Sequence, residues 1–204
     1  MFWYKTITNK KGPSLRRGVA DSEVAGRCYS VLYFIALFIM LLPACKPDIS
    51  NTGVATKYFD LHGYFKKQAA ALAKKSEILK TVDHNGAAES KRVKINDWTK
   101  EFNSFIESDI NKPTWRDSYK IQQSGHTTIY MATDTTIKTR EIIINKKEDG
   151  NVQWIKIYNF THNPLFTSKE NLTYVPDSMY KIEKTQHVKL LGINRYTITG
   201  YLKQ

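Results

Sequence analysis

The chain has 204 residues, of which 41% are hydrophobic and 25% charged, and its formal net charge is +12 at pH 7. This length suits one domain that is large enough for a hydrophobic core. A net positive charge is compatible with three classes of partner, namely nucleic acid, anionic lipid and acidic glycan. The lysines are spread along the chain instead of grouped, and we therefore expect no nucleic-acid partner.

A short apolar segment near the N-terminus determines where we expect the protein to reside. Tyr29–Leu42 spans 14 residues with few polar atoms, and it follows Arg27 and precedes the small residue Ala44. The segment is too short for a bilayer span of about 20 residues. Its order of positive charge, apolar run and small residue is instead typical of an export signal.

The residues that end this segment, Leu42-Pro43-Ala44-Cys45, resemble the lipobox of bacterial lipoproteins. In that family the cysteine sulfur carries a diacylglycerol, and a dedicated peptidase cuts just before it. The resemblance implies a lipid anchor on Cys45. In that family an aspartate directly after the cysteine retains the protein at the inner membrane. Lys46 stands at this position, which implies the outer membrane. Whether the protein lies on the periplasmic or the surface face stays open. A plain secretory signal with an accidental cysteine, or an uncleaved anchor, is the alternative.

This interpretation divides the chain into three segments. Residues 1–44 form the signal peptide, and the acidic residues in its unusually long start indicate that translation begins closer to Arg27. Residues 45–53 form a lipidated tether with proline, glycine and small polar residues. Residues 54–204 form a single domain.

Cutting before Cys45 changes the charge and the thiol content of the chain. It removes six basic and two acidic side chains, which lowers the net charge from +12 to +8. Cys28 is lost with the signal and Cys45 is acylated. The mature domain is therefore expected to hold no free thiol and no disulfide.

Hydrophobic periodicity predicts two helices early in the domain. The first runs from Val54 to about Glu77, with apolar residues at spacings of three and four, namely Tyr58, Leu61, Phe65, Ala69 and Leu72. The second begins at Asn96 or Asp97 as its cap and runs to about Asp109. Between them, two alternating runs flank Asn85-Gly86, which predicts a β-hairpin because both residues tolerate positive φ.

From Thr114 onward the hydrophobic period changes to two, which predicts strands. The expected strands are Trp115–Gln123, His126–Thr133, Ile137–Asn145, Val152–Phe160, Leu172–Val175, Tyr180–Thr185, and Val188–Leu202 with a break at Leu191-Gly192. The short turns between them require antiparallel pairing. The predicted fold class is α+β, with two N-terminal helices and a small hairpin packed on a curved antiparallel meander of six or seven strands. A meander of this length tends to curl towards a half-barrel or barrel.

No pattern in the sequence points to catalysis. The five histidines lack partners at metal-binding spacing, and we expect no metal and no other cofactor. There is no glycine-rich phosphate loop and no nucleophile elbow. Asp109 and Asp117 are the nearest approach to a carboxylate pair, and we expect a protein that is not an enzyme.

The segment from Ser108 to Tyr119 combines acidic, basic, amide and aromatic side chains. Its candidate binding residues, here called the recognition corner, are Asp109, Trp115, Arg116, Asp117 and Tyr119. The alternative is a helix-to-strand connection whose polar groups satisfy the backbone and whose Trp115 fills the core. Together with Tyr64-Phe65 and Asn85-Gly86, this segment resembles lipoproteins of Bacteroidota, and that resemblance implies a location but no mechanism.

A second candidate contact lies between Asn159 and Asn171, where Phe160, Leu165 and Phe166 stand in a stretch with little charge. Exposed apolar side chains at a hairpin tip can contact a membrane or a partner. They can equally fold back over an open end of the sheet.

Two functions remain in competition. The first is a membrane-anchored envelope lipoprotein that acts as a non-catalytic binding or scaffolding module for a protein, glycan or lipid. The second is a carrier of an apolar ligand, with a curved sheet like that of lipocalins or periplasmic lipoprotein carriers. Large side chains on the predicted helices, such as Phe65 and Phe102, are expected to fill the concave side of the sheet, which favours the binding module.

Overall fold

The computed structural model describes residues 56–75 and 77–203. The predicted signal peptide, the lipidation site Cys45 and the tether lie outside the described residues. The helical elements are α2 (Leu61–Leu72), α3 (Trp98–Glu101), α4 (Asn103–Glu107) and the 3₁₀ turn η1 (Pro113–Trp115). The strands are β1 (Ile78–His84), β2 (Ala87–Val93), β3 (Tyr119–Ser124), β4 (Thr127–Ala132), β5 (Thr139–Lys146), β6 (Val152–His162), β7 (Phe166–Val175), β8 (Met179–Val188) and β9 (Gly192–Tyr201).

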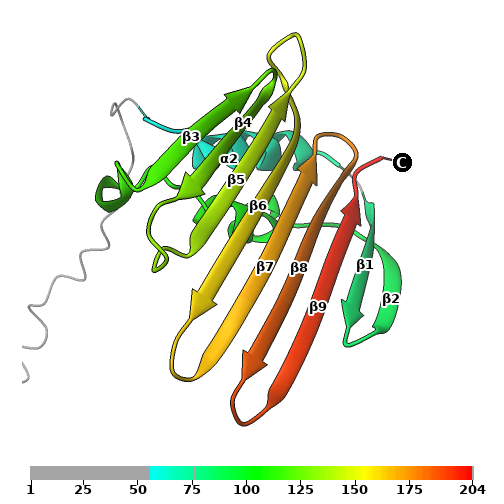
Figure 1. Cartoon of the computed structure of the whole chain (residues 1–204). Coiled ribbons are helices and arrows are strands. Elements are labelled where there is room, and N and C mark those ends of the chain that lie inside the picture. The colour runs from blue at the N-terminus through cyan, green and yellow to red at the C-terminus, as the bar shows by residue number, and fades with distance from the viewer. Residues whose placement is uncertain (1–55, 76, 204) are drawn as a thin grey trace, which may run out of the picture. The chain divides into compact units, whose positions relative to one another are not determined.

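All these strands belong to one antiparallel sheet in the order β2-β1-β9-β8-β7-β6-β5-β4-β3 (Figure 1). The predicted α+β class with an antiparallel sheet is confirmed. Strands β3 to β9 form the predicted meander, which has seven strands where six or seven were expected. The hairpin β1–β2 does not pack on the sheet as predicted, because β1 pairs with β9 and so extends the sheet to nine strands. The sheet stays open, with β2 at one edge and β3 at the other.

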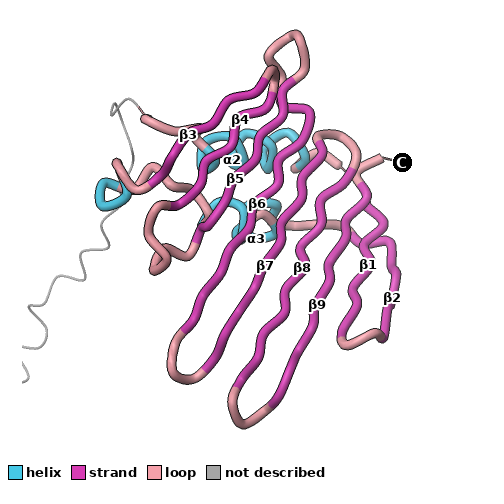
Figure 2. Tube along the Cα trace, in the orientation of Figure 1, coloured by secondary structure: helices cyan, strands magenta, loops and turns pink. Residues whose placement is uncertain are grey.

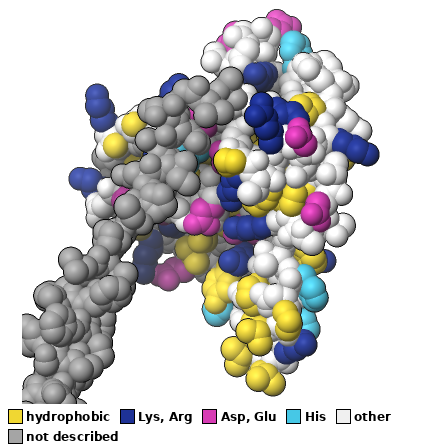
Figure 3. Space-filling view, turned by 90° about the vertical axis from the view of Figure 1, so that its left-hand side faces the viewer, with side chains coloured by type: hydrophobic (Ala, Val, Ile, Leu, Met, Phe, Trp, Pro, Cys, Tyr) yellow, Lys and Arg dark blue, Asp and Glu magenta, His cyan; other side chains and the backbone are white. Residues whose placement is uncertain are grey.

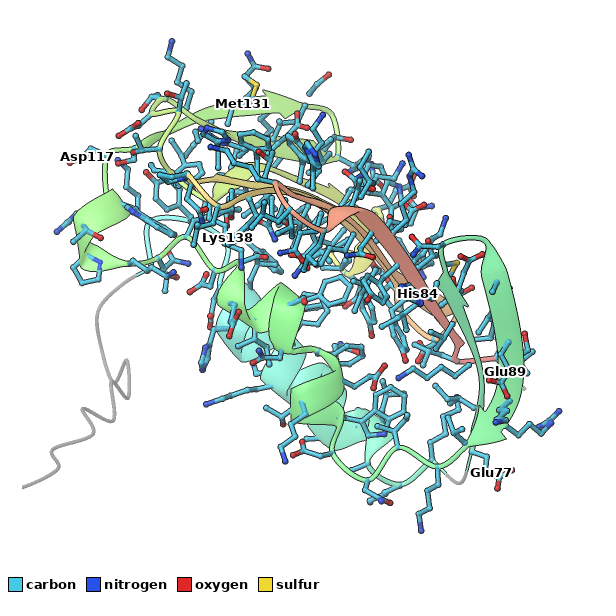
Figure 4. The ribbon with its side chains drawn as sticks, turned by 90° about the horizontal axis from the view of Figure 1, so that it is seen from below. Glu77, His84, Glu89, Asp117, Met131 and Lys138 are labelled. Carbon is cyan, nitrogen blue, oxygen red and sulfur yellow. The ribbon has the colours of Figure 1, made fainter. Side chains whose placement is uncertain are left out.

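The sheet is curved and the described helices lie on its concave side. Seen from below in Figure 4, it arches over the helices, and the β1–β2 hairpin with His84 and Glu89 curls down at one side. Figure 2 shows that the helices cover only the upper part of the sheet, so that the lower ends of β6 to β9 project beyond them. None of the described helices is long and apolar enough to span a membrane.

Helix α2 is shorter than the predicted span from Val54 to Glu77. It begins after Asp60, whose Oδ1 accepts a hydrogen bond of 2.7 Å from the backbone N–H of Gly63. A side-chain cap of this kind satisfies one of the N–H groups that have no partner in the first turn, and it fixes the start of a helix. The predicted apolar face is nevertheless buried, from Leu61 through Phe65 and Ala69 to Leu72.

The prediction of one continuous helix from Asn96 or Asp97 to Asp109 is wrong in detail. Of the two predicted cap residues, Asn96 and Asp97, it is Asp97 that caps the helix. Its Oδ1 accepts a hydrogen bond of 3.1 Å from Lys100 N. The helix then breaks at Phe102, whose dihedral angles of −90° and 11° lie outside the helical region, and it resumes as α4.

Aromatic rings from the helices and the sheet interlock in the core. Phe65 and Phe102 contact each other at 5.4 Å between ring centroids, and both meet Tyr174 on β7 at 5.1 and 5.6 Å. Phe102 also meets Tyr180 on β8 at 5.5 Å, with the two rings nearly perpendicular. Edge-to-face pairs of this kind add about 0.5–1.5 kcal/mol each to the burial of the rings.

Two strand boundaries differ from the predicted ones for identifiable reasons. β3 begins at Tyr119 instead of Trp115, because Pro113 starts the 3₁₀ turn η1. β7 begins at Phe166 instead of Leu172. The sequence did not predict its first half because the inward-facing residues there, Ser168 and Glu170, are polar and interrupt the apolar alternation. The Asn85-Gly86 turn is confirmed, with φ of 54° and 92°.

Candidate functional site

A row of polar side chains crosses the concave face just below the aromatic core. Cross-strand pairing places each member opposite the next, in the order Thr139, Asn159, Glu170, Lys184, Tyr196 and His84. We call these six residues the polar row. The period of two along each strand keeps them on the same face as the core residues Leu172 and Ile157. The row is buried on β5 to β7 and becomes accessible towards β9 and β1.

The accessible part of the row lines a groove of about 340 Å³ between the sheet and helices α3 and α4. Its polar lining includes Lys80, Glu101, Ser104, Glu170, Lys184 and Tyr196. Ile182 and Ile198 add an apolar wall. Ligand sites commonly combine apolar walls with a few convergent polar groups, and this groove has both.

Glu170 lies at the buried end of the groove within a hydrogen-bond network. Asn159 Nδ2 donates to Glu170 Oε2 at 2.9 Å and to Ser108 Oγ at 2.8 Å. Ser104 Oγ reaches Glu170 Oε1 at a long 3.4 Å. Asn159 Oδ1 accepts no hydrogen bond from the described residues although it is fully buried. The network joins α4 to the sheet and fixes the Glu170 carboxylate in one orientation.

Glu101 is held at the upper edge of the groove by two donors. The Tyr180 hydroxyl donates to Glu101 Oε1 at 2.5 Å, and Lys80 Nζ lies 2.6 Å from the same oxygen. Burial raises the pKa of the Tyr180 hydroxyl, and the Glu101 carboxylate raises it further. The tyrosine therefore stays a neutral donor, and α3 is fastened to β1 and β8.

The open end of the groove carries an aromatic platform. The rings of His84 and Tyr196 stack at 4.5 Å with an interplanar angle of 8°. Tyr196 is 41% exposed, and its cross-strand neighbour Lys184 makes no ion pair with any described residue. This end can therefore offer a cation and a ring to a ligand. Among the described residues, no group of His, Cys, Asp and Glu side chains could hold a metal ion.

The structure divides the predicted recognition corner between the interior and the surface. Asp109 is buried, accepts from Asn111 Nδ2 at 3.0 Å, and has its pKa raised by burial. Tyr119 is also buried, and its hydroxyl donates to Thr139 O at 2.8 Å, while burial raises its pKa. Both residues satisfy interior groups, and neither belongs to an accessible surface.

The other three corner residues lie nearer the surface. Asp117 is exposed and pairs with Lys57 at 2.7 Å, and the hydrogen bond from Lys57 lowers the pKa of that carboxyl. Arg116 offers its backbone oxygen to the Tyr58 hydroxyl at 2.5 Å. Trp115 lies under the ammonium of a neighbouring lysine at 4.1 Å. The contacts of Lys57 and Tyr58 hold these two residues against the segment just before β3.

The predicted contact loop lies at the far end of the sheet. Leu165 is 72% exposed in the β6–β7 turn, and Phe166 is half-buried beside it. Phe160 lies further up β6 with the guanidinium of Arg140 5.4 Å from its ring centroid, so it does not share the tip.

The structure adds residues to this loop that the sequence interpretation missed. Lys189 N donates to Leu165 O at 3.2 Å, which brings the β8–β9 turn against the β6–β7 turn. Leu190 and Leu191 in that second turn are 95% and 78% exposed, and Ile193 at the start of β9 is 51% exposed. The sequence held one signal for this surface. It is the apolar run Leu-Leu-Gly-Ile at residues 190–193, where a turn is expected to be polar.

Comparison of the chain with protein-family models, with curated proteins and with solved structures gave no match. The fold and the groove therefore define the class only as a sheet-dominated α+β protein with an open antiparallel sheet.

Proposed function

We propose that the protein is a non-catalytic binding module of the bacterial cell envelope, anchored at the outer membrane by a lipid on Cys45. The observation that carries the binding role is the polar row, which turns from a buried network into an accessible groove on the concave face. Its inner groups are already oriented by hydrogen bonds. Such preorganisation lowers the conformational cost of binding.

The groove chemistry favours a glycan that carries carboxylate groups. Glu101 is neutralised by Lys80, which leaves Lys184 and Lys100 as the cations of the groove available to an incoming carboxylate. Among the described residues, Lys100 makes only a long ion pair of 3.9 Å with Asp97. Glu170 can accept hydrogen bonds from hydroxyl or amide groups, and the exposed Tyr196 can lie against the apolar side of a sugar ring. Charge-assisted hydrogen bonds of this kind supply both affinity and orientation.

A carrier of an apolar ligand is the second candidate, and Ile182 and Ile198 in the groove wall are the observation in its favour. The concave side is nevertheless occupied by fully buried rings, among them Phe65, Phe102 and Tyr174. An acyl chain would have to displace these rings. The loss of their packing would lower the free energy of unfolding by several kcal/mol. The glycan-binding module therefore ranks first.

Retention on the host's own insoluble cell-wall glycan tests the proposal, because this polymer presents carboxylates close to its sugar rings. Tyr196→Ala and Lys184→Ala are each expected to weaken retention about tenfold, which corresponds to about 1.4 kcal/mol. Each has a matched control on the opposite face of the same strand. Tyr201→Ala removes a tyrosine of similar exposure, 44%, and Lys181→Ala removes a lysine, and both should leave retention unchanged.

Two outcomes would count against the binding module. Native mass spectrometry of protein purified from its host would reverse the ranking if one lipid per chain co-purified. Hydrolysis of the cell-wall glycan that disappears with Glu170→Gln would show an enzyme instead.

A further inference from the structure

The joined tips of the β6–β7 and β8–β9 turns form an exposed aliphatic surface that the groove does not explain. This surface, here called the aliphatic tip, consists of Leu165, Leu190, Leu191 and Ile193. Figure 3 shows hydrophobic side chains gathered at the lower end of the molecule, over these hairpin ends, with basic and histidine side chains beside them. Contiguous exposed apolar side chains mark contact sites with membranes or other proteins.

The charge around the tip has one sign. Residues 161–169 and 185–196 contain no aspartate or glutamate, and they contain Lys169, Lys189 and Arg195. Lys169 and Arg195 both stand opposite Thr185, on the adjoining strands β7 and β9, so they share a level of the sheet just behind the tip. Aliphatic side chains in front of a cationic level match the layers of a bilayer with anionic head groups.

Several backbone groups at the tip already have partners, which lowers the cost of moving the tip out of water. Asn163 Oδ1 accepts from the backbone N–H groups of Leu165 and Phe166, each at 2.9 Å. Leu165 O accepts from Lys189 N at 3.2 Å, and Leu191 N donates to Val188 O at 3.1 Å. Unpaired backbone groups are what excludes most turns from the apolar part of a membrane.

We propose that the aliphatic tip inserts into the surface of an anionic lipid bilayer, with Lys169, Lys189 and Arg195 contacting the head groups. A second copy of the chain fits less well, since four aliphatic side chains expose less than the roughly 1,200–2,000 Å² that a specific protein interface buries. The inference does not depend on the glycan groove, which lies between the sheet and the helices.

Flotation with lipid vesicles tests the inference on residues 54–204, which exclude the predicted lipid anchor. This part keeps every core residue that the structure describes, because the described members of the buried cluster all lie between Tyr58 and Leu202. Cooperative thermal unfolding of each variant checks that it is folded. The vesicles contain equal parts of phosphatidylglycerol and phosphatidylcholine, with pure phosphatidylcholine as the comparison.

The tip should bind the mixed vesicles and bind pure phosphatidylcholine much more weakly. Leu165→Ser, Leu190→Ser and Leu191→Ser combined should weaken binding by about tenfold or more. Lys169→Gln, Lys189→Gln and Arg195→Gln should each weaken it about fivefold at low salt. The control is Ile121→Ser on β3, which removes an exposed aliphatic side chain outside the tip and should change nothing.

Three results would overturn the inference. These are equal binding of the triple-serine variant and the wild type, equal binding to neutral and anionic vesicles, and self-association through the tip without any vesicle binding.

Discussion

The ring of Tyr180 on β8 lies directly over Gly200, its cross-strand partner on β9. A Cβ atom at position 200 would lie 2.6 Å from the Tyr180 hydroxyl oxygen and closer still to two ring carbons. Only glycine leaves room for the ring in this position, from which the hydroxyl reaches Glu101. The absence of a side chain at Gly200 thus allows Tyr180 to hold α3 against the sheet.

Gly200→Ala should therefore lower the free energy of unfolding by about 1–3 kcal/mol, because the ring must move or the strands must separate. Urea unfolding measures the effect. In a Tyr180→Leu background the ring is absent, and the same Gly200→Ala change should cost less. Equal costs in the two backgrounds would show that the close approach is not the cause.

Phe102 lies at the centre of the aromatic core, with Phe65, Trp98, Phe105, Tyr174 and Tyr180 around it. Phe102→Ala should lower the free energy of unfolding by about 3–5 kcal/mol, since the cavity is enclosed by rigid rings. Ile121→Ala, at an exposed strand position, should stay within about 0.5 kcal/mol of the wild type. A small effect at Phe102 would contradict a tightly packed concave side and would favour the apolar-ligand carrier.

Asp109 should make stability fall as the pH rises. Burial raises the pKa of its carboxyl in the folded state above the ordinary 3.8, so the folded protein binds the proton more tightly than the unfolded chain. The stabilisation from Asp109 is fully present at a pH below the ordinary pKa of 3.8. It is lost as the pH rises through the raised pKa of the folded state. Asp109→Asn removes the titration while it keeps an oxygen for Asn111.

The measurement is the free energy of unfolding of wild type minus that of Asp109→Asn between about pH 3 and 7. The difference should decrease with rising pH and then level off. The subtraction matters because Asp134, whose pKa is lowered by hydrogen bonds from Thr136, acts in the opposite direction in both proteins. A difference that does not depend on pH would contradict the assignment.

Asn159→Asp should place a second carboxylate beside Glu170 in the buried part of the polar row. It removes the donor that serves Glu170 and Ser108 and brings two like charges together. The expected loss is about 3 kcal/mol at neutral pH, and it should shrink in acid as one carboxyl takes up a proton.

The control for this change is Asn171→Asp, which adds the same charge next to Glu170 in sequence but at an exposed position on the outer face. Guanidinium unfolding at neutral and acidic pH should show a small, pH-independent effect for the control. Similar losses in both variants would mean that Asn159 has no special role in the network.

Local patterns in the sequence determined most of the secondary structure. The period of two from Thr114 onward predicted all seven strands of the meander, and Asn85-Gly86 predicted the hairpin turn. The apolar stripe from Leu61 to Leu72 predicted the buried face of α2. These features depend on residues close in sequence, whose side chains report directly on which face is buried.

Only the tertiary structure decided which distant residues meet. The pairing of β1 with β9 joins residues more than 100 positions apart, and the polar row exists only because six strands share one register. The contact of Leu165 with Lys189 likewise turns two separate turns into one aliphatic tip. Strand register and chain path depend on the whole sheet, and a local pattern can predict a face but not the neighbours on it.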